Sequence, residues 1–249
     1  MSFKVTILGS SGAMPAYGRH PSAQLVEIQN RYFLVDCGES VQIQLARFQA
    51  NVHRIDHILI SHLHGDHYLG LMGLLFTMQM QRRTEDLHLY SFKGLDEIIT
   101  AHLRYSQSTL AYRVIFHILK PDAREIIFED SALTVETIPL LHKIKCSGFL
   151  FREKPKPKRI DKTRMPEGLL LQQIASLKRG EDVLDDEGNV LYKNDDLTLS
   201  ARRSRSYAYC SDTAYSERII QQIKNINLLY HESTFIQEDE IKAKETKHS

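Results

Sequence analysis

The stretch IDHILISHLHGDH, residues 55–67, joins an apolar run to a cluster of metal-type side chains. The run 55–60 predicts a strand, and four candidate ligands follow it: His62, His64, Asp66 and His67. The first two stand two apart on chain leaving a strand, so both imidazoles can point to one side. Gly65 permits a tight turn that returns the last two toward them. A polar surface loop with chance histidines is the alternative, but it leaves this density unexplained.

Two ligand pairs suit two metal ions about 3.5–4 Å apart, an arrangement that serves in-line attack on a phosphate or ester. Imidazole with carboxylate favours Zn²⁺, and Mn²⁺ is also compatible. Further ligands are then expected at later strand ends. His142 follows the apolar run 138–141, and Asp212 follows 207–210. A capped core histidine and a helix N-cap are the structural alternatives; beside the histidine loop, we favour ligands.

The rest of the chain alternates strands and helices, with hairpins between some strands. We expect strands at 3–8, 23–28, 32–35, 87–92, 112–119, 126–128, 133–138, 148–152, from 206 onward, and 227–230. We expect helices at 41–48, 69–80, 95–105, 169–177 and 217–224. This order predicts an α/β sandwich of mixed sheets with helices outside.

Composition limits the possible partners and compartments. Thirty-two basic and 31 acidic residues give a net charge of +1, so nucleic-acid binding would require a local basic patch. Three cysteines without a C-x-x-C pair fit a reducing compartment. We find no signal peptide and no apolar run of membrane-spanning length. The expectation is a cytoplasmic protein that does not bind membranes.

A local basic patch is present in EKPKPKRIDKTR, residues 153–164, where two prolines exclude a core strand. Its cations are Lys154, Lys156, Lys158, Arg159, Lys162 and Arg164. A solvated loop is the usual structure for such a charge run. The functional interpretation is an arm that binds RNA phosphates, since phosphate contacts dominate such affinity.

The ordered pattern H-x-H-x-D-H, a later lone histidine and an aspartate after a strand resembles the metallo-β-lactamase superfamily. More closely, the chain resembles its ribonuclease Z family, endonucleases that remove the 3′ trailer from precursor tRNA. The matching stretches are GSSGAMP (9–15), DCGE (36–39), SHLHGDHYLGLMGLL (61–75), IFED (127–130), LLH (140–142), SDT (211–213), HESTF (231–235) and KHS (247–249). Ser211 stands where the family usually has glycine, and the family's Gly-Pro at the arm tip is not evident.

The resemblance implies a four-layer αβ/βα sandwich in one domain, 1–249, with an inserted tRNA-binding arm at about 153–200. It implies two Zn²⁺ per subunit: one held by His62, His64 and His142, one by Asp66 and His67, with Asp212 bridging. Asp66 would also accept the proton of the attacking water, and His248, oriented and kept cationic by Glu232, would protonate the leaving oxygen. Family members act as homodimers in which the arm reaches the partner's active site.

Family members also continue for some tens of residues beyond the position of Ser249, and a further histidine there completes the second metal. We therefore expect these 249 residues to be part of a longer chain that contains the C-terminal end of the family's domain. We therefore expect a vacant or half-occupied second metal position and poor activity. Two other functions remain open: a different metallo-β-lactamase-fold hydrolase, acting on a small phosphodiester, thioester or lactone, or a non-catalytic RNA-binding relic.

Overall fold

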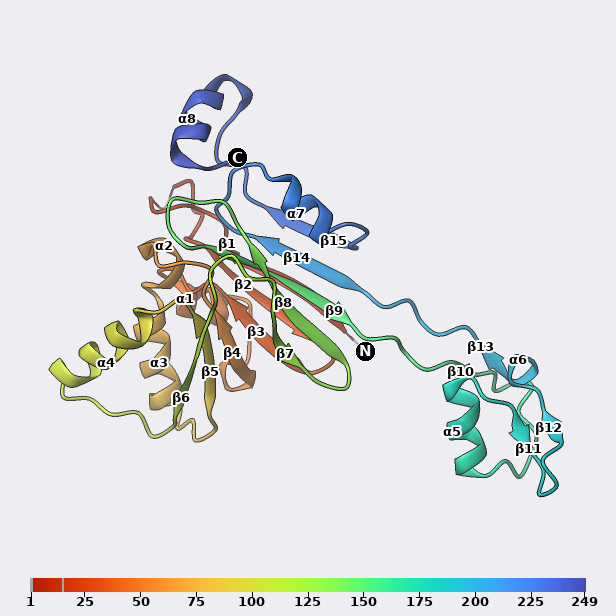
Figure 1. The fold of residues 1–249 in the computed structure, drawn as a ribbon. Coiled ribbons are helices and arrows are strands. Elements are labelled where there is room, and N and C mark those ends of the chain that lie inside the picture. Colours follow the sequence, from red (N-terminus) through yellow and green to blue (C-terminus); the bar gives the residue numbers. More distant parts are fainter. Residues whose placement is uncertain (1, 15) are drawn as a thin grey trace.

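Two β-sheets lie face to face with helices on their outer sides in the computed structural model, which describes residues 2–14 and 16–249 (Figure 1). The first sheet has the order β1-β2-β3-β4-β5-β6. Its strands are β1 (Phe3–Gly9), β2 (Ala23–Ile28), β3 (Arg31–Val35), β4 (Ile55–Leu59), β5 (Leu87–Ser91) and β6 (Val114–Ile118). Strands β1 to β3 pair antiparallel, and β3 to β6 pair parallel.

The second sheet has the order β15-β14-β9-β8-β7. Its strands are β7 (Ile126–Glu129), β8 (Leu133–Pro139), β9 (Ser147–Glu153), β14 (Ser206–Cys210) and β15 (Leu228–His231). Only β14 and β15 pair parallel. Both sheets are therefore mixed, as the alternation of elements predicted.

Helices pack on the outer faces of both sheets. On the first sheet these are α1 (Val41–Arg47), η1 (Val52–Arg54), α2 (Gly65–Tyr68), α3 (Leu71–Met80) and α4 (Leu95–Tyr105). On the second sheet, α7 (Glu217–Gln222) contacts β8. After β15, η2 (Gln237–Asp239) and α8 (Glu240–Thr246) extend beyond the end of the sheets (Figure 1). Helix α3 is apolar around most of its circumference, and its helix-favouring Leu and Met residues suit this conformation. Four of them are buried: Leu71, Leu74, Leu75 and Met78.

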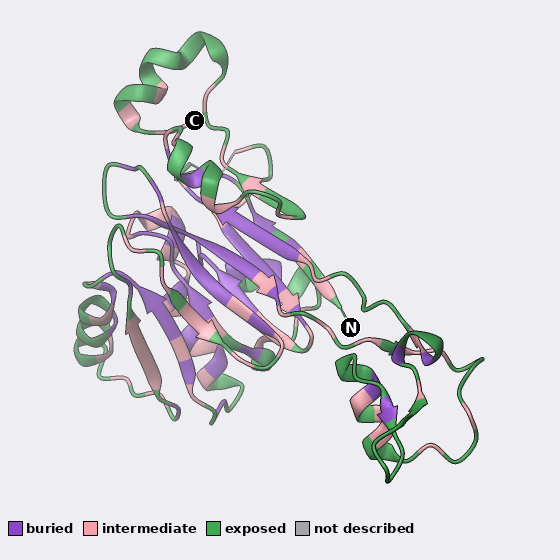
Figure 2. Cartoon of the chain, turned by 45° about the vertical axis from the view of Figure 1, so that its right-hand side comes forward, coloured by how far each residue is buried: buried purple, intermediate pink, exposed green. Residues whose placement is uncertain are grey.

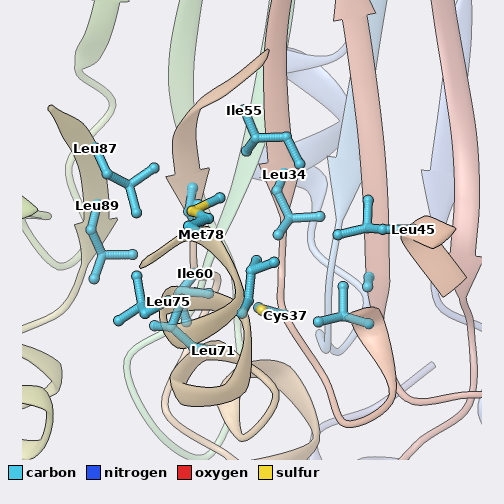
Figure 3. Packing of buried hydrophobic residues seen from close by; sticks show 14 of the residues in the cluster. Leu34, Cys37, Leu45, Ile55, Ile60, Leu71, Leu75, Met78, Leu87 and Leu89 are labelled. Atoms are coloured by element: carbon cyan, nitrogen blue, oxygen red, sulfur yellow. The ribbon is translucent and has the colours of Figure 1, made fainter. Parts of the chain in front are cut away.

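Separate hydrophobic layers hold the sandwich together. Between the sheets, aromatic residues dominate, including Phe33, Phe149 and Phe151. Between the first sheet and its helices the layer is aliphatic, and Figure 3 shows Leu75 and Met78 of α3 near Leu87 and Leu89 of β5. Burial of each such side chain is worth about 1.5–3 kcal/mol. These layers make the sheets a rigid support for the loops at their ends.

Residues 154–205, called the arm below, lie to one side of the sandwich on two extended linkers (Figure 1). The arm contains β10 (Arg159–Ile160), α5 (Leu171–Arg179), β11 (Val183–Leu184), β12 (Val190–Tyr192), α6 (Asn194–Leu197) and β13 (Thr198–Leu199). Strands β10 and β13 pair, as do β11 and β12. Its small core is Leu177, Val183 and Leu197, and most of its surface is exposed (Figure 2).

Several local expectations differ from the structure. Asp66 lies in the first turn of the short helix α2 rather than in a plain turn. Glu153, expected in the exposed basic segment, ends β9 and is buried. The arm's strands and α8 were not expected, because strands of two or three residues carry no periodic signal. Pro15, within the GSSGAMP stretch, lies outside the described residues. Within the described chain, no helix combines the length and apolarity needed to cross a bilayer.

Candidate metal centre

The candidate site lies where strands of both sheets end. His62 and His64 follow β4, and Asp212 follows β14. The loop after β8 supplies His142. The amide of the preceding residue, Leu141, donates to Thr213 Oγ1 at 3.0 Å, which holds this loop beside Asp212. The packing of the two sheets therefore brings ligands from distant parts of the chain to one edge.

One group of four side chains has the donor geometry of a metal site. His62 Nε2 lies 3.0 Å from His64 Nδ1, which lies 3.3 Å from His142 Nε2. Asp212 Oδ2 is 3.6 Å from His62 Nε2. Tetrahedral Zn²⁺ with Zn–N bonds of about 2.0–2.1 Å separates its nitrogen ligands by roughly 3.3 Å. The donors of His62, His64, His142 and Asp212 therefore fit a zinc ion.

A second group shares Asp212. His67 Nε2 lies 3.5 Å from Asp66 Oδ2 and 3.6 Å from Asp212 Oδ1. Asp212 thus turns its Oδ2 to the histidine group and its Oδ1 to His67, which is the placement of a bridging carboxylate. These atoms offer three protein ligands to a second ion.

Glu232 and His248 form a pair at the same edge. Glu232 Oε1 lies 2.8 Å from His248 Nδ1 and accepts the Thr213 amide at 2.7 Å. His248 Nε2 is 3.9 Å from Asp212 Oδ2. The ligand atoms of Asp212, Glu232 and His248 lie within 4.8 Å of one another, so this trio could also hold an ion.

The neighbouring charges and burial set the protonation states of the candidate ligands. Burial lowers the pKa of His62 to about 2, so its imidazole is neutral and one nitrogen carries a lone pair. Burial alone would raise the pKa of Asp212, but His67 and His62 outweigh it and hold this pKa well below the ordinary value. Burial opposes the charge on His67, yet Asp36 and Asp212 raise the pKa of His67 well above 6.5. His67 therefore carries a proton that balances the neighbouring carboxylates, and a metal ion bound at its Nε2 would replace that proton.

Asp36 is a site residue that the sequence reasoning missed. It is fully buried directly after β3. Its carboxylate lies 2.8 Å from His67 Nδ1, and it accepts the Ser61 amide at 2.7 Å and the Tyr209 hydroxyl at 2.6 Å. The available signal was the DCGE stretch, in which an acid directly follows an apolar strand.

A cavity of about 730 Å³ opens over these groups. Residues of the loop after β1, including Ser11 and Arg19, line one side, and Glu232 to Thr234 line another. Asp66, Asp212 and His248 all face it. A substrate in this cavity therefore has access to both ligand groups and to the Glu232–His248 pair.

The six arm cations differ in their surroundings. Lys154 pairs with Glu129 at 2.6 Å, Lys156 with Glu153 at 2.5 Å, Lys158 with Asp195 at 2.7 Å, and Arg164 with Asp161 at 3.7 Å. Arg159 donates to the Ser200 carbonyl at 3.0 Å, and Lys162 is exposed. Sequence reasoning missed Arg202 and Arg203, exposed on the returning linker, whose side chains have no bonded partner among the described residues. Their signal was the basic run SARRSR.

The chain is similar to known proteins over its full length. Residues 3–156 match the family model described as "Anti-Pycsar protein Apyc1". The chain is 48% identical over 249 residues to a Ribonuclease Z of Cytophaga hutchinsonii, covering 100% of this chain and 80% of that protein. It is 42% identical to a Ribonuclease Z of Bacteroides thetaiotaomicron, covering 99% and 78%. The crystal structure of human tRNase Z, short form, superposes with a TM-score of 0.72 at 25% identity, covering 98% and 83%.

The fold and the site define a protein of the metallo-β-lactamase fold with a metal-ion-binding site at the edge of its two sheets. Among such proteins, the full-length identities decide the family. The chain belongs to the ribonuclease Z family.

Proposed function

We propose that this protein is a zinc-dependent endoribonuclease that removes the 3′ trailer from precursor tRNA and leaves a 3′-hydroxyl on the tRNA. The observation that carries the proposal is the meeting of metal-type donors and the Glu232–His248 pair at one cavity. It occurs in a chain 48% identical over its full length to a Ribonuclease Z.

His62, His64, His142 and Asp212 would hold one zinc ion, and Asp66 and His67 would hold a second that shares Asp212. Bound zinc acidifies water and stabilises the negative charge that develops on the reacting phosphate. Mn²⁺ would suit the same mixture of imidazole and carboxylate. The donor distances described above support the first site, and the two oxygens of Asp212 support the bridging role.

The chain's own residues would move two protons. Asp66 faces the cavity and would accept the proton of the attacking water. His248 would donate a proton to the 3′-oxygen of the tRNA as the phosphorus–oxygen bond breaks. Glu232 holds His248 at Nδ1, which leaves Nε2 on the side of Asp212. This pair is therefore oriented for proton donation.

The arm would bind tRNA through phosphates. Among the six predicted cations, Arg159, Lys162 and Arg164, in β10 and the turn after it, are exposed, and the returning linker adds Arg202 and Arg203. The remaining cations, Lys154, Lys156 and Lys158, could add to the positive field, but their pairing with acids favours a role in holding the arm.

The arm joins the sandwich at the start of β14, whereas Asp212 follows the other end of that strand. A strand of this length spans roughly 17 Å, and the arm extends away from the site (Figure 1). This geometry supports a homodimer in which the arm of one subunit serves the site of the other. Three free cysteines support action in the reducing cytoplasm.

The decisive experiment incubates the protein with an end-labelled precursor tRNA and maps the cut. We expect cleavage just past the acceptor stem, with a 3′-hydroxyl on the tRNA. A small phosphodiester competes in the same assay. Preference for the small diester, with no specific tRNA cut, would assign the site to another hydrolase of this fold.

A further inference from the structure

Ser61 and Ser211 stand immediately before metal-type ligands, and their side chains meet behind the site. Ser61 precedes His62 at the end of β4, and Ser211 precedes Asp212 at the end of β14. Their Oγ atoms lie 3.0 Å apart although the residues are 150 positions apart in sequence. Both are buried, with 0% and 2% exposure. This contact therefore joins the two sheets directly behind the ligands that each sheet supplies.

The surroundings of Ser61 determine the direction of its hydrogen bonds. Ser61 Oγ lies 2.9 Å from Asp36 Oδ2 and 3.0 Å from His62 Nδ1. His67 Nδ1 is also 3.4 Å from Ser61 Oγ, but its shorter contact, at 2.8 Å, is with Asp36 Oδ2. A hydroxyl has one hydrogen to donate and two lone pairs that accept. The Asp36 carboxylate only accepts, so the hydrogen of Ser61 goes to Asp36. The oxygen of Ser61 is left to accept one bond from His62 Nδ1–H and one from the Ser211 hydroxyl.

This arrangement decides which nitrogen of His62 can bind a metal. A hydrogen on Nδ1 leaves the lone pair on Nε2, the atom that faces His64 and Asp212. Cys146 Sγ lies 3.6 Å from the same Nδ1, but a thiol is a weaker acceptor. Ser61 is thus the main acceptor that holds His62 in its ligand tautomer.

We propose that Ser211 is a positioning residue for the metal site. It donates to Ser61, completes the two acceptor positions of that hydroxyl, and ties Asp212 to His62 across the two sheets. Hydrogen bonds in such a chain polarise one another, so the donation strengthens the bond from Ser61 to Asp36. The inference rests on the metal site of the proposed function, and it can be tested without RNA.

The test measures zinc affinity of the full chain by competition with a chromophoric chelator. The variants are Ser211→Ala, Ser61→Ala and the double variant. Loss of an outer partner of a ligating histidine typically costs 10–100-fold in metal affinity. We expect about tenfold or more for Ser61→Ala and a several-fold loss for Ser211→Ala. Because Ser211 acts through Ser61, its replacement should have no further effect in the Ser61→Ala background.

Ser206→Ala is the matched control. Ser206 begins the same strand β14, and its hydroxyl is paired with Asn227 Oδ1 at 3.1 Å, at the opposite end from the site. It should keep wild-type zinc affinity. Thermal unfolding of the zinc-free variants separates effects on metal affinity from effects on folding. Ser211→Gly is a second variant without the hydroxyl, and it also lacks the β-carbon that alanine keeps.

Wild-type zinc affinity in both Ser211 variants would overturn the inference, as would an equal loss in the wild-type and Ser61→Ala backgrounds. Either result leaves the proposed function intact, because the wild-type protein still binds zinc. A wild-type protein that binds no zinc would overturn the metal site and the inference together.

Discussion

Glu153 joins the arm to the sandwich, and its replacement by glutamine should loosen the arm selectively. Its side chain is fully buried at the end of β9. It pairs with Arg205 of the returning linker at 2.7 Å and with Lys156 of the outgoing linker at 2.5 Å, and it accepts from Gln29 of the sandwich at 3.0 Å. One carboxylate thus connects both linkers to the first sheet.

The size of the effect follows from the pKa of Glu153. Burial alone would raise this pKa, but the bonds from Arg205, Lys156 and Gln29 outweigh burial and lower it from 4.5 to about 2. At 1.36 kcal/mol per unit this corresponds to at most ~3 kcal/mol. The side chain of Arg205 is 36% exposed, so water screens part of the attraction. We expect Glu153→Gln to lower the free energy of arm opening by about 2 kcal/mol, which is roughly 30-fold in the opening equilibrium.

Hydrogen exchange read by mass spectrometry measures this effect by segment. Amides at both ends of the arm should exchange about 30-fold faster, while β8 and the centre of β9 stay protected. The depressed pKa makes the stabilisation fully present above pH 4.5 and lost as pH falls toward 2. The wild-type arm should therefore open over that range, and the glutamine variant should show little further change.

Glu129→Gln is the control, because Glu129 also pairs with an arm lysine, Lys154, but is 51% exposed. Exposed pairs contribute about 0.2–1 kcal/mol, so arm exchange should change little. Equal effects of the two variants, or unchanged arm exchange in Glu153→Gln, would refute the reasoning.

Further predictions concern the site and the RNA. Asp66→Ala should abolish cleavage while precursor tRNA still binds in a filter assay; near-normal turnover would remove Asp66 from the mechanism. Glu232→Gln should lower kcat about 10–100-fold with little change in KM, because it removes the charge that holds His248; an unchanged kcat would exclude the pair from proton transfer. Reversal of Arg202 and Arg203 to Glu should weaken tRNA binding and reduce its salt dependence but spare a small diester; equal loss on both substrates would indicate a folding defect. Calorimetric zinc titration should resolve one tight and one weaker ion, since four donors serve the first group and three the second; two equally tight ions would reveal a further ligand.

Local patterns in the sequence predicted much of the fold. The helical spacing of Val41 and Leu45 is visible in the sequence and agrees with α1, in which both are buried, because the buried face of a helix repeats every 3.6 residues. The two mixed sheets were likewise expected from alternating strands and helices. The short strands β10 and β13 were not, since two residues cannot show a period and depend on pairing with each other.

The candidate site likewise has residues that the sequence indicated and contacts that only the fold creates. The resemblance in HESTF and KHS singled out Glu232 and His248, which the structure brings to 2.8 Å. The number of cations in the arm overstated its free positive charge, because the sequence does not show which acidic residues pair with them. Lys154, for example, pairs with Glu129 of β7, which is distant from it in the sequence.

The sequence by itself determined which chemical groups this protein has: the histidines and aspartates after strands, the basic linkers, and the residues of each buried face. Only the tertiary structure decided which of them meet. Hydrogen bonds and ligand contacts act over about 3 Å, whereas Asp36 and Tyr209, or Ser61 and Ser211, are separated by most of the chain. Sheet pairing and packing set those distances, so the support beneath the ligands, and the pairing of Lys154 with Glu129, emerge only when the sandwich is assembled.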